Sequence, residues 1–198
     1  MIATILLCTL TNLVVNGDFE NVLATPKALD KTILRQQRLG WEYGRGPIAF
    51  RPAGWRTASG LGRCWSVDCR EDARQRPFVH GGEAALFLGD KEQKTAHLMQ
   101  ERTIPPGRYA LSLWTRGTGR LRVLAYACDD RGKWVKCPPP AFEGSSADKI
   151  EIASSETWTE THGKVRLGDA PGVSGVYFAL MALGGDVYVD DVVLTEEK

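Results

Sequence analysis

The stretch RYALSLWTRGTGRLRVLAYACDDRGKWVKC, residues 108–137, indicates most clearly how this chain folds. Apolar and polar residues alternate along it with a period of two, as in strands whose successive side chains point to opposite faces of a sheet. GTG at 117–119 and DDRG at 129–132 interrupt the alternation with residues typical of turns. The stretch therefore predicts three strands joined by two turns.

The later part of the chain continues this pattern. TWTETHGKVRL at 157–167, GVYFALMAL at 175–183 and DVYVDDVVLT at 186–195 are short, rich in β-branched and aromatic residues, and bounded by Gly, Asp or Pro. Only TPKALDKTILRQQRL at 25–39 looks helical, and it could equally be a long surface loop. Many short strands with almost no helix predict an antiparallel β-sandwich.

Length and composition are those of one globular domain. The chain has 198 residues, 43% of them hydrophobic and 25% charged, which allows a packed core. Its formal net charge of +1 provides no overall field to attract nucleic acid or an anionic membrane. We expect a monomer whose partner is uncharged.

The N-terminal residues leave two interpretations open. IATILLCTL at 2–10 has the length of a signal-peptide core, but no Lys or Arg precedes it and no A-x-A site follows. It is too short to span a bilayer, which needs about 20 apolar residues. Residues 1–11 are therefore either a clipped or weak export signal or a first strand, and the domain extends over 12–198.

The cysteines suggest two local disulfides. Besides Cys8, they form the close pairs Cys64 with Cys69 and Cys128 with Cys137, both in sequence typical of loops or hairpins. Such bonds need an oxidising compartment, so they predict a secreted or cell-surface protein. The alternative is free thiols in a cytosolic protein. The spacings C-x4-C and C-x8-C argue against zinc.

Six segments occur in an order that resembles a known family. They are NLVVNGDFE at 12–20, PAGW at 52–55, VHGGEAALFL at 79–88, HLMQERTIPPGRYALSLWTRG at 97–117, SETWTE at 155–160 and VYVDDVVL at 187–194. Together they resemble the jelly-roll carbohydrate-binding modules of the galactose-binding-like superfamily, the type appended to xylanases and glucanases. The resemblance covers nearly the whole chain and is weakest at 22–76. It implies a jelly roll that binds a polysaccharide or oligosaccharide without cleaving it.

The resemblance also implies a structural calcium ion between the first and last strands. The Asp18 carbonyl and the Glu20 side chain would then meet Asp190, giving a hard cation oxygen ligands from distant parts of the chain. RQRPFVH at 74–80 lacks the acidic ligand common in that region of such modules, and Glu83 is the nearest substitute. The alternative is that these acids are turn and surface residues.

The stretch 109–127 supplies candidates for sugar binding. If GTG closes a hairpin, Trp114 lies opposite Arg122, with Arg116 and Tyr126 on the same face. Leu111 and Leu113 would share the other face with further aliphatic side chains. A mixed face of rings and guanidinium groups suits a neutral pyranose, whose C–H groups stack on rings and whose hydroxyls bind polar groups. Alternatively, Arg122 stacks on Trp114 only to stabilise the sheet.

Further rings lie in loop-like sequence. Trp65 falls inside the expected Cys64–Cys69 loop, and Trp41 and Tyr43 belong to the Gly-flanked segment LGWEYGRG. These three are additional candidates for the sugar site. Structural roles are expected for Trp55, Trp158, Tyr177 and Tyr188, and the position of Trp134 after a tight turn leaves its role open.

The sequence does not favour an enzyme. It has no H-E-x-x-H and no G-x-S-x-G motif. The adjacent acids Asp129–Asp130 and Asp190–Asp191 would point to opposite faces of a strand, which is wrong for an acid and base flanking one bond. A non-catalytic module is therefore predicted. The alternatives are a structural or protein-interaction sandwich and a glycan-active hydrolase or lyase.

Overall fold

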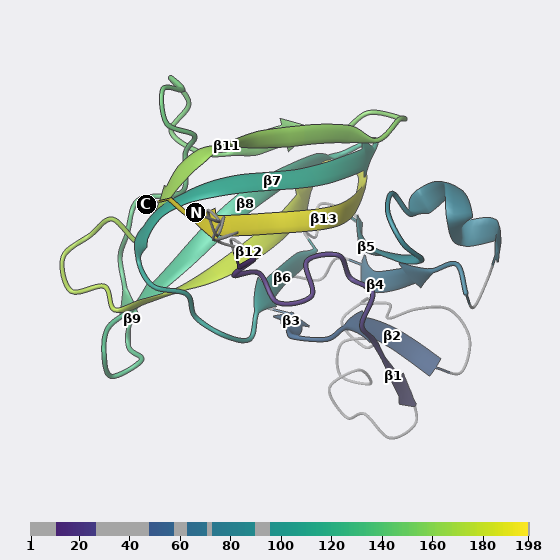
Figure 1. Ribbon diagram of the computed structural model, residues 1–198, viewed down its shortest axis with the longest axis horizontal. Coiled ribbons are helices and arrows are strands. Elements are labelled where there is room, and N and C mark those ends of the chain that lie inside the picture. The colour runs from purple at the N-terminus through teal and green to yellow at the C-terminus, as the bar shows by residue number, and fades with distance from the viewer. Residues whose placement is uncertain (1–10, 27–47, 58–62, 71–72, 90–95, 198) are drawn as a thin grey trace, which may run out of the picture.

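The strands form two packed antiparallel sheets and a separate two-stranded ribbon (Figure 1). The computed structural model describes residues 11–26, 48–57, 63–70, 73–89 and 96–197. The predicted all-β sandwich is confirmed. Within these ranges, no helix is long and apolar enough to cross a membrane.

The elements divide among the two sheets as follows. The five-stranded sheet has the order β11-β7-β13-β5-β4, with β4 at Arg63–Asp68, β5 at Ala84–Gly89, β7 at Gly107–Gly117, β11 at Thr159–Leu167 and β13 at Asp186–Glu196. The six-stranded sheet has the order β10-β8-β12-β6-β3, with β9 also paired to β8; its strands are β3 at Trp55–Thr57, β6 at His97–Gln100, β8 at Arg120–Cys128, β9 at Trp134–Val135, β10 at Glu151–Ala153 and β12 at Gly175–Leu183. The ribbon pairs β1 (Val22–Pro26) with β2 (Ile48–Pro52), and the 3-10 helix η1 covers Ala73–Phe78.

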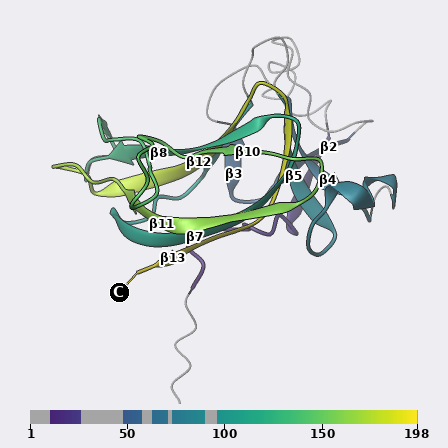
Figure 2. The ribbon, with the colours of Figure 1, turned by 90° about the horizontal axis from the view of Figure 1, so that it is seen from above.

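The core lies between the two sheets, which Figure 2 shows as separate layers. Leu111 and Leu113 of β7 are at most 1% exposed, and Leu121 and Val123 of β8 are fully buried. These four aliphatic side chains therefore lie in the core, as predicted. They reach it from opposite layers, because β7 and β8 belong to different sheets.

The expected hairpin between β7 and β8 is wrong. Trp114 of β7 lies opposite Glu160 and Asp190, whereas Arg122 of β8 lies opposite Glu151. The chain at 117–119 crosses from one layer to the other.

Close packing of two connections holds this crossing in place. The amides of Thr118 and Gly119 both donate to the carbonyl of Asp186, at 2.9 and 3.1 Å. A Cβ at Gly119 would lie 2.8 Å from the carbonyl carbon of Gly185, so a side chain does not fit there. The glycines that suggested a tight turn instead let the β7–β8 and β12–β13 connections touch.

The segment 12–20 is a turn beside β13, and the predicted closeness of the first segment to the last strand is confirmed. The amide of Leu13 donates to the carbonyl of Leu194 at 2.8 Å. Phe19 is fully buried, with its ring 5.6 Å from the buried Trp55 ring, so Trp55 has the structural role expected. The Phe between two carboxylates therefore anchors this turn in the core.

Candidate functional site

The outer face of the six-stranded sheet consists of the side chains that alternate with core residues along its strands. Arg122 of β8 lies beside Met181 of β12, which lies beside His97 of β6. Further along, Tyr126 of β8 lies directly opposite Tyr177 of β12. Because opposed residues of antiparallel strands share a face, these side chains form one surface.

Trp134 of β9 extends this surface with an exposed ring. This residue is 58% exposed. Its centroid lies 6.1 Å from the Tyr126 ring and 5.5 Å from the Tyr177 ring. The Arg56 guanidinium of β3 lies 5.3 Å from the centroid of Tyr177. Three neighbouring rings with one open indole provide an apolar platform for the C–H face of a sugar.

A tight turn places Trp134. The Asp129 carboxylate accepts hydrogen bonds from the amides of Arg131 and Lys133, at 3.0 and 2.8 Å. Gly132 has φ of +76°, a conformation that suits glycine. The turn predicted from DDRG is confirmed, and it returns the chain so that Trp134 lies opposite Cys128 of β8.

A buried histidine positions Tyr126. His97 is 3% exposed, and its Nε2 lies 3.1 Å from the Tyr126 hydroxyl. Burial lowers the pKa of His97 to about 4 and raises the pKa of Tyr126. Both groups are therefore neutral at neutral pH, and the phenol is held by a hydrogen bond between uncharged partners.

A charged cluster occupies the other end of the same face. Arg122 Nε donates to Glu151 at 2.9 Å. Arg120 lies 3.3 Å and Lys149 3.4 Å from the same carboxylate. The hydrogen bond from Arg122 is the largest of several influences that lower the pKa of Glu151. Three cations thus share one carboxylate.

Of the four candidates predicted in the stretch 109–127, two lie on this face and two do not. Arg122 and Tyr126 point outward from β8 beside the rings described above. Trp114 and Arg116 point outward from β7, on the opposite side of the sandwich. The four residues therefore do not form the single surface that the hairpin predicted.

The chain around η1 covers the outer face of the five-stranded sheet near Trp114. The His80 ring stacks on Trp114 with centroids 3.8 Å apart and planes 16° apart. Arg116 lies 5.3 Å from the Phe78 ring and donates to the carbonyl of Pro77. One face of the Trp114 ring is therefore occupied by protein.

The side chains of the remaining ring candidates lie outside the described part of the structure. Trp65 lies in β4 opposite Phe87, in a strand and not in a loop; its side chain is outside the described part of the structure. Trp41 and Tyr43 lie outside the described residues altogether.

The expected calcium ligands bind backbone amides. The Glu20 carboxylate accepts hydrogen bonds from the amides of Glu83 and Ala84, at 2.7 and 2.9 Å. The fully buried Asp190 carboxylate accepts them from His80 and Gly81, at 3.0 and 3.2 Å. Both acids thus hold the loop before β5 against the sheet.

Guanidinium groups bring positive charge to this loop. Arg70 donates to the Asp68 carboxylate at 2.7 Å and to the Glu20 carbonyl at 3.2 Å, and Arg76 donates to the Gly82 carbonyl. Asp18 is exposed. No group of three or more His, Cys, Asp or Glu side chains in the described ranges could hold a metal. The hydrogen bonds that Glu20 and Asp190 already accept argue against the calcium ion that the resemblance implies, and the ion stays an untested prediction.

The predicted disulfides are wrong for both cysteine pairs. All four cysteines are free. Cys64 and Cys69 are separated by the length of β4, roughly 16 Å in an extended strand, whereas bridged Cα atoms lie about 4.4–6.8 Å apart. Cys128 lies opposite Trp134, while the Cys137 sulfur lies near the carbonyl of Ala125, at 3.9 Å. Secretion stays a prediction, without the support of disulfides; Cys8 is outside the described residues.

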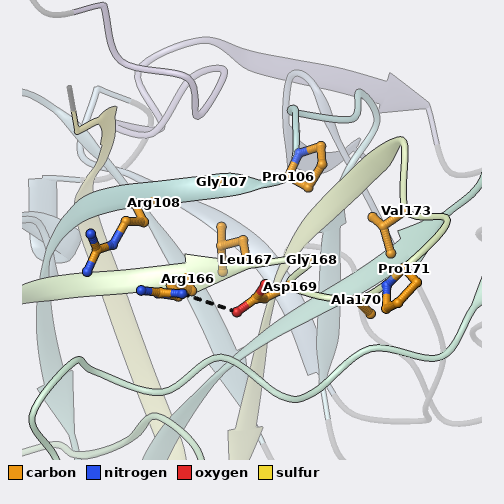
Figure 3. A pocket seen from close by; sticks show the side chains of 10 residues that line it. All are labelled: Pro106, Gly107, Arg108, Arg166, Leu167, Gly168, Asp169, Ala170, Pro171 and Val173. Carbon is orange, nitrogen blue, oxygen red and sulfur yellow. Dashed lines mark hydrogen bonds and ion pairs between the residues drawn. The ribbon is translucent and has the colours of Figure 1, made fainter.

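A cavity at one end of the sandwich offers different chemistry. It has a volume of about 480 Å³ and lies between the start of β7 and the chain after β11 (Figure 3). Arg108 and Arg166 at its edge both bind Glu143, at 2.9 and 3.1 Å. Arg166 also reaches Asp169 at 3.4 Å. No aromatic side chain of the described residues lines it, so it lacks a stacking surface for a sugar.

Sequence reasoning missed four residues of the outer face: Trp134, Tyr177, His97 and Arg56. Two signals in the sequence point to this grouping. Tyr126 and Tyr177 occupy outward positions of strands that alternate, and Trp134 follows the turn at the end of the strand that carries Tyr126. Only the pairing of β8 with both β12 and β9 brings the rings together.

No family model matches the sequence, and no curated protein matches it. Among solved structures, a candidate sugar-binding protein from Bacteroides thetaiotaomicron VPI-5482 is similar over 94% of this chain and 100% of that chain, with a TM-score of 0.50 and 16% identity. The module TmCBM61, in complex with β-1,4-galactotriose, is similar over 74% of this chain and 91% of that chain, with a TM-score of 0.46 and 19% identity.

The enzymatically active domain of tailspike protein 4 from bacteriophage CBA120 is also similar, with a TM-score of 0.47 and 14% identity. This similarity covers 72% of our chain but only 19% of the tailspike chain. Similarities at such low identity concern the fold. The chain has the antiparallel jelly-roll fold that the sequence predicted, and it shares this fold with the candidate sugar-binding protein.

Proposed function

We propose that this protein is a carbohydrate-binding module that holds a glycan on the outer face of the six-stranded sheet. The observation that carries the proposal is the exposed Trp134 indole next to the Tyr126 and Tyr177 rings. The three neighbouring rings form an apolar patch, and a stacked sugar ring would cover its exposed indole. The shared fold with the candidate sugar-binding protein of Bacteroides thetaiotaomicron supports the same function.

The surrounding polar groups fit the hydroxyls of a sugar. The Tyr126 hydroxyl is fixed by His97, and the Arg122 guanidinium is fixed by Glu151. Groups held in place before binding lose little conformational freedom when a ligand arrives. In this proposal Trp134 and Tyr177 stack on sugar rings, and Tyr126 and Arg122 bind their hydroxyl groups.

The proposed function is binding without catalysis. Glycoside hydrolysis ordinarily uses two carboxyl groups on either side of the scissile bond. On the outer face of the six-stranded sheet, the strand residues that we describe include one carboxylate, Glu151, and three cations already surround it. We therefore expect neither reducing sugar nor unsaturated product to be released from a bound polymer.

Affinity electrophoresis tests the proposal. The chain should be retarded in gels that contain a polymer it binds, with xylan, β-glucan, mannan and galactan as the first panel. Trp134→Ala should abolish the retardation, because the open ring is the main stacking surface. Trp114→Ala should preserve it in a folded variant, because that ring is on the opposite sheet and stacks on His80.

Two outcomes would contradict this assignment. Loss of binding in Trp114→Ala with full binding in Trp134→Ala would move the site to the five-stranded sheet. No retardation by these or by charged glycans would favour a protein-interaction module. Circular dichroism of each variant is needed to show that its fold is intact.

A further inference from the structure

Basic side chains outnumber acidic ones on the outward-facing positions of the six-stranded sheet. Its strands carry Arg56, Arg120 and Arg122, but only one acid, Glu151, among the described residues that point outward. Arg120 and Arg122 both bind Glu151, and Lys149 is a third cation on the same carboxylate. The strands of this face therefore carry more cations than acids, although the net charge of the chain is only +1.

Arg56 is the cation best placed to act on a ligand. It is exposed, and its guanidinium lies over the Tyr177 ring, which contacts the open indole of Trp134. Among the described residues, no carboxylate forms an ion pair with Arg56. Contact with the ring restrains the guanidinium while its N–H groups stay available.

Two further cations are close to Trp134 in the sequence. Lys133 and Lys136 lie one residue before and two residues after Trp134, and both are exposed. Neither forms an ion pair within the part of the chain that the structure describes. The nearby Asp129 carboxylate accepts amide hydrogen bonds within its own turn. The turn that precedes Trp134 also holds Asp129 and Asp130, so Arg56 remains the cation that contacts the rings directly.

We propose that the site selects an acidic sugar, a hexuronic acid whose ring stacks on Trp134 and whose carboxylate binds Arg56. This inference rests on the function proposed above and names its ligand class. A guanidinium binds a carboxylate through two parallel hydrogen bonds, a geometry that sugar hydroxyls do not match. The net charge of the chain led us to expect an uncharged partner, whereas this proposal names an acidic one. The two differ because the net charge is summed over both sides of the sandwich.

Matched polymers test the inference. The probes are polygalacturonate, glucuronoxylan and alginate, each measured beside the same polymer after reduction of its carboxyl groups, in 150 mM salt. At least one acidic polymer should be retained, and carboxyl reduction should weaken its binding about tenfold, the effect expected from losing one charge-assisted contact. Arg56→Gln should abolish this preference without affecting the reduced polymer.

The matched control is Lys164→Gln on β11 of the opposite sheet, which removes the same charge from an exposed site. It should preserve the preference for the acidic polymer, which excludes a general effect of net charge. A sulfated galactan beside its desulfated form distinguishes a carboxylate from a sulfate ester. Binding of the sulfated polymer alone would overturn the carboxylate assignment.

The outcomes separate the two proposals. Equal affinity for acidic and reduced polymers, with both lost in Trp134→Ala, would overturn the acidic-sugar inference and preserve the carbohydrate site. A preference that persists in Arg56→Gln would also overturn it. Binding that survives Trp134→Ala would instead contradict the proposed function itself.

Discussion

Phe19 is a single residue on which the N-terminal turn depends. Its side chain is fully buried against Trp55, so Phe19→Ala removes a large apolar group from the core. We expect the free energy of unfolding to fall by about 3–5 kcal/mol. Urea denaturation followed by tryptophan fluorescence measures the change.

Val193→Ala is the control for this substitution. Val193 is 36% exposed, so its truncation should change the free energy of unfolding by no more than about 0.5–1 kcal/mol. Equal losses in the two variants would show that Phe19 does not hold the turn in the core.

His97 should make stability depend on pH. Its pKa is lowered to about 4 in the folded protein and is about 6.5 in an unfolded chain. Between these values the unfolded chain binds more protons, so the contribution of His97 to stability is present above pH 6.5 and is lost as the pH falls to 4. His97→Gln should remove this dependence, which urea titrations from pH 4 to 7.5 would measure.

Asp190 opposes this effect. Burial, and next the charge of Asp191, raise the pKa of Asp190 to about 7, so its contribution favours the folded state at low pH and declines as the pH rises from about 4 to 7. The wild-type curve therefore shows partial cancellation. Subtracting the free energy of unfolding of His97→Gln from that of wild type isolates the contribution of His97. If this difference did not change with pH, His97 would not be buried as a neutral ring.

At the scale of elements, the pairing of β7 can be tested directly. Ser112 lies opposite His162 of β11. Opposed residues in antiparallel strands are close enough to be bridged, so Ser112→Cys with His162→Cys should form a disulfide on mild oxidation. Mass spectrometry of tryptic peptides would identify this bond and distinguish it from any bond to a native cysteine.

Ser112→Cys with Leu124→Cys is the matched control. A hairpin closed at 117–119 would place these two residues opposite one another, whereas the structure puts them on the outer faces of different sheets. This pair should not cross-link. A bond between 112 and 124 would restore the hairpin.

The sequence predicted the strands and their faces better than their partners. Alternation identified Leu111, Leu113, Leu121 and Val123 as core residues, because the side-chain period is local. It could not show that β7 and β8 pair with other strands, since glycines at 117–119 suit a hairpin and a crossing equally well. The predicted hairpin therefore placed Trp114 on the same face as Arg122. The disulfides were predicted wrongly because the sequence does not show which strand residues lie opposite one another.

At the scale of the whole molecule, the attachment of the N-terminal turn to β5 and β13 should not need a metal. Three amides donate to the Asp190 carboxylate, and Arg70 and Arg76 place positive charge around Glu20 and the loop before β5. We therefore expect the melting temperature to be the same in EDTA and in millimolar calcium. Differential scanning calorimetry measures both.

Protein prepared in EDTA from the start is the necessary control, because a bound ion could survive brief dialysis. A clear rise in melting temperature on adding calcium, absent with magnesium, would support the ion that the resemblance implies. Asp190→Asn should then remove the rise.

The contact between Leu13 and the end of β13 has a practical consequence. Both ends of the described chain emerge from the layer opposite the exposed indole. A reporter protein or a surface tether fused at either end would therefore leave the open layer accessible to solution. Immobilised and free chains should accordingly capture the same polymers, even polymers far larger than the domain itself.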